Sequence, residues 1–104
     1  MTTFDDRENA YENMFVHDEE LRFKANARCN KLLALWAAGK MNKAEGEIDA
    51  YVAEVIKSDF EEAGHEDVIR KVAGDLDDLS SAEEVRAKRA ELLAVAQKQV
   101  AAEA

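Results

Sequence analysis

The sequence has no proline and only four glycines in 104 residues, so few positions interrupt a helix. It also has no run of alternating strand-forming side chains, whereas the strong helix formers Ala, Leu, Glu, Lys and Arg dominate. A hydrophobic content of 47% is sufficient for a folded core and argues against wholesale disorder. These features predict an all-α protein, and the chain length fits a single core.

Long hydrophobic runs and paired cysteines are missing as well. No window approaches the roughly 18 consecutive apolar residues of a membrane span, and the acidic start MTTFDDREN is no secretory signal. Cys29 is the single cysteine, so no internal disulfide can form, which fits a reducing compartment. The formal net charge of −9 disfavours nucleic acid and anionic lipid as partners. We therefore expect a cytoplasmic protein without direct membrane insertion.

Apolar side chains recur at helical spacing along most of the chain. After an N-terminal segment, helices are expected over about residues 18–38, 45–63 and 66–76, and from the Ser81/Glu84 capping box through Val100. Gly39 and Gly64 are expected to end the first two of these helices. The short connections predict antiparallel neighbours in a compact bundle of four to five helices.

The expected core positions follow from the same periodicity. The helix over residues 18–38 presents an apolar stripe that includes Cys29, which we interpret as a small buried hydrophobe, and Trp36. The expected buried positions are Leu21, Ala25, Cys29, Leu32, Leu33, Trp36, Ile48, Tyr51, Val52, Val55, Ile56, Phe60, Val68, Ile69, Val72, Leu76, Val85, Leu92, Leu93, Ala96 and Val100.

The N-terminal segment carries a separate aromatic stripe. Phe4, Tyr11 and Phe15 fall within roughly 40° of one another on a helical wheel. This stripe is narrow, flanked by charges, and rotated by roughly 60° from the stripe of the next helix. Either the chain bends near residues 16–20, or the stripe is left for another surface. The residues alone leave open whether it is core or a helix-in-groove ligand.

Nothing in the sequence assembles a catalytic or metal centre. The pair His17 and His65 has no metal-ligand spacing, and a calcium-loop pattern starting at Asp75 fails at Ser80 and Arg86. There is no glycine-rich phosphate loop, and the acidic pairs fit a solvated surface. We expect no cofactor, no metal and no enzymatic activity.

Several blocks of sequence resemble the zeta subunit of alphaproteobacterial F-type ATP synthases, over nearly the whole chain. They are Phe4-Asp5-Asp6-Arg7-Glu8, Ala27-Arg28-Cys29-Asn30-Lys31-Leu32-Leu33, Leu35-Trp36-Ala37-Ala38, Asp59-Phe60-Glu61-Glu62-Ala63-Gly64-His65-Glu66-Asp67-Val68 and Arg70-Lys71-Val72.

The resemblance implies an inhibitor of ATP hydrolysis with two parts, an N-terminal inhibitory segment (1–18) and a helical body (19–104). The segment would enter a catalytic α/β interface beside the central stalk and block hydrolytic rotation while permitting synthesis. The implied partners are the α, β and γ subunits of the catalytic head. We expect the protein to be a monomer when it is free. When it is bound, it would be attached peripherally to the membrane-bound synthase. The implied partner-binding residues are Phe4, Asp5, Asp6, Arg7, Glu8, Tyr11, Glu12 and Phe15.

The match to the family pattern is incomplete at two positions. Asn9 stands where the family commonly has a basic residue, and Cys29 where it often has an arginine. Some members of the family contact a purine nucleotide through the body, but no motif for this is present here, and the question stays open. The alternative to an inhibitor is a generic helical adaptor with no effect on ATP hydrolysis.

Overall fold

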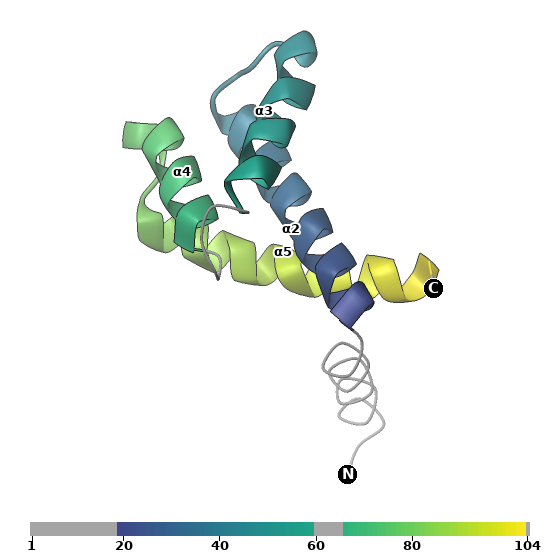
Figure 1. Cartoon of the computed structure of the whole chain (residues 1–104). Helices are drawn as coiled ribbons and strands as arrows, with labels where there is room; N and C mark the ends of the chain where they lie inside the picture. Colours follow the sequence, from purple (N-terminus) through teal and green to yellow (C-terminus); the bar gives the residue numbers. More distant parts are fainter. Residues whose placement is uncertain (1–18, 60–65, 104) are drawn as a thin grey trace.

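The computed structural model describes residues 19–59 and 66–103, and this part of the chain is almost entirely helical, without a strand. The all-α prediction is therefore confirmed. The elements are α2 (Glu19–Lys40), α3 (Glu45–Ser58), α4 (Glu66–Leu76), the 3-10 turn η1 (Asp77–Leu79) and α5 (Ala82–Glu103) (Figure 1).

The two long helices, α2 and α5, form the frame of the body although they come from opposite ends of the described chain. α5 runs across α2 and contacts it extensively, and α3 folds back alongside α2 (Figure 1). α4 packs against α3 and α5, which closes the bundle. Each helix therefore buries one face against at least two others, as a compact helical bundle requires.

The main core lies where α2, α3, α4 and α5 meet. Its buried residues are Leu33, Ala34, Ala37, Ala38, Tyr51, Val55, Val68, Ile69, Val72, Leu76 and Val85. All four apolar positions predicted for α4 are buried, and Cys29 is fully buried as expected. A second and much smaller cluster, Ala25 and Val100 with Leu21 and Ala101 packed against it, lies between α2 and α5.

The prediction that Gly39 ends the first described helix is wrong, because α2 continues through Lys40. The left-handed residue is Asn42, with φ 54°. The Asn42 amide donates to the Gly39 carbonyl oxygen at 3.2 Å, and the Lys43 amide donates to that of Ala38 at 3.1 Å. This pattern is a Schellman motif, in which asparagine can replace glycine because it tolerates the left-handed conformation.

The next helix, α3, ends earlier than predicted, at Ser58 rather than Ala63. The Ser58 hydroxyl donates to the Val55 carbonyl oxygen at 2.6 Å. In a continuing helix this oxygen would accept a backbone amide, so a side chain takes the place of a backbone donor at the helix end. Phe60 and Gly64, which the sequence assigned to the core and to the helix end, lie outside the described residues.

Two further expectations are corrected in part. Ser81 does cap α5, because its hydroxyl accepts the Glu84 amide at 3.1 Å. However, the Glu84 carboxylate accepts from the Ser80 hydroxyl at 2.7 Å and pairs with Lys40 at 3.4 Å, so the reciprocal half of a capping box is missing. Trp36 is only partly buried at the edge of the core, with Lys40 Nζ 5.2 Å from its ring centroid.

Candidate partner-binding surface

The eight residues predicted to bind the partner all precede Glu19 and lie outside the described residues. They are Phe4, Asp5, Asp6, Arg7, Glu8, Tyr11, Glu12 and Phe15. The structure does describe the part of the body that adjoins this segment in the chain, which we call the base. This base is the first half of α2 together with the end of α5.

The first turn of α2 begins directly after the predicted inhibitory segment. Glu19 and Glu20 stand in this turn, where carboxylates interact favourably with the helix dipole. They also pair along the helix, Glu19 with Arg22 at 3.8 Å and Glu20 with Lys24 at 3.5 Å. Acidic side chains at the helix start and basic ones a turn later therefore favour a helix from Glu19 onwards.

The end of α5 holds this part of α2 in place. Arg28 reaches across to α5, where its guanidinium donates to Gln99 Oε1 at 3.0 Å and to Glu103 Oε2 at 2.9 Å. Beneath these bonds, Ala25 packs against Val100. The start of α2 is thus attached to the last turns of the chain by one polar fork and one small apolar contact.

A buried arginine continues the contact between α2 and α5 toward the main core. Arg89 is buried, and its guanidinium donates to Asn26 Oδ1 at 3.3 Å. Its carbonyl oxygen accepts the Cys29 thiol at 3.4 Å. Burial raises the pKa of the Cys29 thiol, so this cysteine is a packed structural group with little thiolate character.

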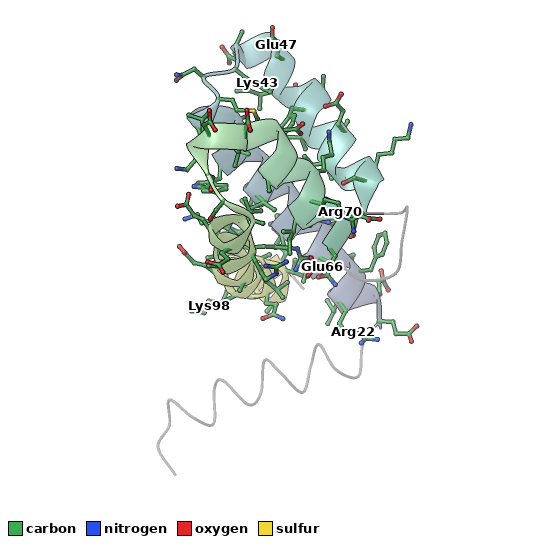
Figure 2. All side chains as sticks on the ribbon, turned by 90° about the vertical axis from the view of Figure 1, so that its left-hand side faces the viewer. Arg22, Lys43, Glu47, Glu66, Arg70 and Lys98 are labelled. Atoms are coloured by element: carbon green, nitrogen blue, oxygen red, sulfur yellow. The ribbon has the colours of Figure 1, made fainter. Side chains whose placement is uncertain are left out.

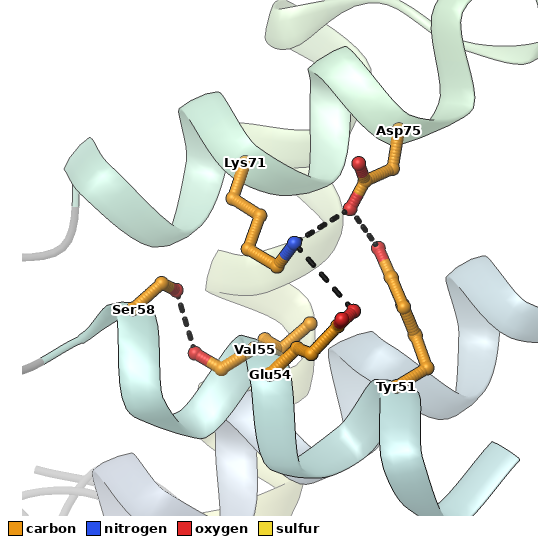
Figure 3. Close-up of polar contacts among 6 residues, drawn as sticks. All are labelled: Tyr51, Glu54, Val55, Ser58, Lys71 and Asp75. Atoms are coloured by element: carbon orange, nitrogen blue, oxygen red, sulfur yellow. Dashed lines mark hydrogen bonds and ion pairs between the residues drawn. The ribbon is translucent and has the colours of Figure 1, made fainter.

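A polar network joins α3 to α4 on another side of the body (Figure 3). The Tyr51 hydroxyl donates to Asp75 Oδ2 at 3.0 Å, and Lys71 Nζ lies 3.2 Å from the same oxygen and 3.8 Å from Glu54 Oε2. Burial, followed by the hydrogen bond to Asp75, raises the pKa of Tyr51 well above its ordinary value. The groups satisfy one another, so the network fastens two helices together.

Within the described ranges, no three His, Cys, Asp or Glu side chains are grouped closely enough to hold a metal ion. The same part of the chain contains no helix that is long and apolar enough to cross a membrane. The network around Tyr51 and the buried Cys29 are the chemically distinctive groups, and both are accounted for by packing.

Comparison with known proteins identifies the family. The family model described as ATPase inhibitor subunit zeta matches residues 1–99. The chain belongs to this family. A similar structure, determined by solution NMR, is 56% identical in sequence and superposes with a TM-score of 0.73, and the match covers 81% of this chain and 99% of that chain. No curated protein matches the chain.

Membership of the zeta family confirms the resemblance seen in the sequence. It makes the chain an ATPase inhibitor subunit, a regulatory protein that binds an ATP synthase. The contacts of the base escaped the sequence analysis because they are long-range. Arg28 and Glu103 are 75 residues apart, and nothing in the local pattern of either helix marks them as partners.

Proposed function

We propose that this zeta subunit blocks ATP hydrolysis by inserting residues 1–18 at a catalytic α/β interface next to the central stalk. The observation that carries the proposal is the extent of the family match, which begins at residue 1 and so includes the whole segment as well as the body. The partners are the α, β and γ subunits of the catalytic head. The protein itself is not an enzyme, and it is located in the cytoplasm at the membrane-bound synthase.

The energetics favour a segment that is supported by a folded body. Burying the aromatic side chains of Phe4, Tyr11 and Phe15 contributes about 5–8 kcal/mol. Ordering some fifteen free residues costs roughly 15–30 kcal/mol of backbone entropy. New backbone hydrogen bonds, charge complementarity and contacts from the body must supply the difference.

The base described above can provide this support from the folded body. The proposed inhibitory segment ends at residue 18, and α2 is described from the next residue, Glu19. α2 is held by the Arg28 bonds to Gln99 and Glu103 and by its packing on the main core. A segment attached directly to a supported helix loses less freedom on binding than one attached through a loose linker.

The test is to add the purified protein to the cognate ATP synthase in coupled membranes and to measure hydrolysis and synthesis separately. We expect hydrolysis to be suppressed and synthesis to be much less affected. Equal loss of both activities at saturating protein would contradict the one-way mechanism. Hydrolysis that stays unchanged, although the protein binds, would favour the adaptor alternative.

A further inference from the structure

We propose that the exposed side of α2 is a second contact surface, which binds an acidic and partly apolar patch on the catalytic head of the synthase. We call this surface the outer face of α2 and define it by Phe23, Lys24, Ala27, Lys31 and Leu35. The inference rests on the proposed function and extends the contact with the head beyond residue 18.

The outer face is marked first by large apolar side chains in water. Phe23 is 62% exposed and Leu35 is 40% exposed. Phe23, Ala27, Lys31 and Leu35 follow one another at intervals of four residues, so they share one side of the helix. At about 1.5 Å per residue they extend over roughly 18 Å, about the length that one helix or loop of a partner can cover.

Phe23 lies beside the buried side of α2. It falls near the side of α2 that carries Ala34 and Ala37 in later turns, since residues eleven and fourteen apart point in similar directions. Those two alanines are fully buried in the main core. Phe23, on the same side of the helix, is exposed instead. An exposed aromatic beside a buried surface is typical of the anchors of protein interfaces.

The charge of α2 indicates the chemistry of the partner. α2 carries five basic side chains and two acidic ones, whereas the whole chain has a formal net charge of −9. Lys24 and Lys31 are exposed on the outer face between the two large apolar side chains. Lys24 pairs with Glu20 at 3.5 Å, but both side chains are mostly in solvent, so a stronger acidic partner can replace this pair. A basic strip on an acidic protein fits an acidic partner surface.

Continuity with the inhibitory segment selects the catalytic head as the occupant. Phe23 is four residues after Glu19, or about 6 Å along the helix axis. If residues 1–18 lie in the α/β interface, the first turns of α2 emerge at its mouth. Phe23 and Lys24, at the start of the outer face, are then the exposed side chains of this face nearest to the surface that surrounds the interface.

The experiment compares matched variants of the full chain as inhibitors of ATP hydrolysis. Phe23→Ser removes the anchor, and Leu79→Ser is its control because Leu79 is 54% exposed on the distant η1 turn. We expect Phe23→Ser to weaken inhibition about tenfold, because the variant loses one large apolar side chain that is partly buried against the partner. We expect Leu79→Ser to have no effect on inhibition. Neither substitution should change the melting midpoint.

A second pair of variants tests the charge. Lys24→Glu with Lys31→Glu should slow association about tenfold at low salt, and the difference should shrink at high salt. The control is Lys57→Glu with Lys98→Glu, which changes the net charge equally at exposed positions on α3 and α5. Figure 2 shows Lys98 on the opposite side of the body from Arg22 in the first turns of α2.

Several results would overturn the inference. One is equal inhibition by Phe23→Ser and the wild type, and another is an equal loss in Leu79→Ser. A marked fall in the melting midpoint of Phe23→Ser would show that the ring packs against this chain. Conversion of a dimer to a monomer with inhibition unchanged would assign the face to a second copy. A wild-type protein that inhibits nothing would refute the proposed function itself, which is a separate result.

Discussion

The two ends of α2 are held in different ways. At the end near Lys40, the residues Leu33, Ala34, Ala37 and Ala38 are enclosed by α3, α4 and α5 in the main core. At the end near Glu19, Ala25 is buried in a small cluster with Val100, and the remaining contacts with α5 are hydrogen bonds of Arg28 and Asn26. One helix therefore joins a well-packed region to a lightly packed one.

The difference indicates how the body divides its tasks. Stability grows with the apolar area removed from water, so the end with the main core contributes most of the free energy of folding. The lightly packed end contributes less to stability, and in the proposed function it is the end that adjoins the inhibitory segment and carries Phe23 of the outer face. Regions that must contact a partner commonly belong to the less stable part of a protein.

The largest expected effect on stability comes from a cavity in the main core, and the comparison is a cavity in the small cluster around Val100. Leu33→Ala should lower the free energy of unfolding by about 2–5 kcal/mol, because Leu33 is fully buried among four helices. Val100→Ala should lower it by only about 1–2 kcal/mol, since the cluster around Val100 is small and can relax. Urea denaturation gives both values.

Hydrogen exchange sharpens the same comparison. Val100→Ala should speed amide exchange mainly in the first turns of α2, whereas Leu33→Ala should speed it throughout the body. Leu35→Ala is the control, because Leu35 is close to Leu33 on α2 but is 40% exposed and lies outside the core. Equal losses of stability in Leu33→Ala and Val100→Ala would show that the two ends of α2 contribute equally to the free energy of unfolding, which would contradict the comparison.

A smaller effect is expected from the network that closes the main core. Tyr51→Phe removes the hydrogen bond to Asp75 and should cost about 1 kcal/mol at neutral pH. The folded state raises the pKa of Tyr51, so the hydroxyl contributes its full stability below the unfolded pKa of about 10 and loses it as the pH rises further.

The pH dependence provides the check on this interpretation. The stability gap between the wild type and Tyr51→Phe should be constant below about pH 9 and should shrink above about pH 10. The measurement is urea denaturation of both proteins over this range. A gap that does not shrink above about pH 10 would mean that the hydroxyl ionises equally easily in the folded and unfolded states, which would contradict the raised pKa of Tyr51.

The sequence predicted the elements whose pattern is local. α4 has the predicted bounds, and its buried residues Val68, Ile69, Val72 and Leu76 were all expected, because a short amphipathic helix with no competing face has one way to pack. The helix end was predicted at Gly39 because glycine commonly follows the last turn of a helix, whereas the chain uses Asn42 in the left-handed conformation three residues later. Trp36 was placed in the core by its spacing, but it is only partly buried and packs against the edge of the core.

The contacts between distant helices could not be predicted in the same way. Arg89 is a charged residue on the buried side of α5, and only the tertiary arrangement brings Asn26 within reach of its guanidinium. The candidate site was obtained from resemblance to the zeta family, since an aromatic stripe alone fits a core or a partner groove equally well. The exposed Phe23 was missed because the periodicity of α2 gives it no special position.

The central claim is that the body folds independently of the inhibitory segment, and deletion of residues 1–16 tests it most directly. The truncated and full-length proteins should be compared in one preparation, by thermal unfolding and by inhibition of ATP hydrolysis. The account predicts a cooperative unfolding transition with a nearly unchanged midpoint, because the main core begins well after this segment, together with loss of inhibition. A truncated protein that no longer unfolds cooperatively, or one that inhibits as strongly as the full-length chain, would contradict it.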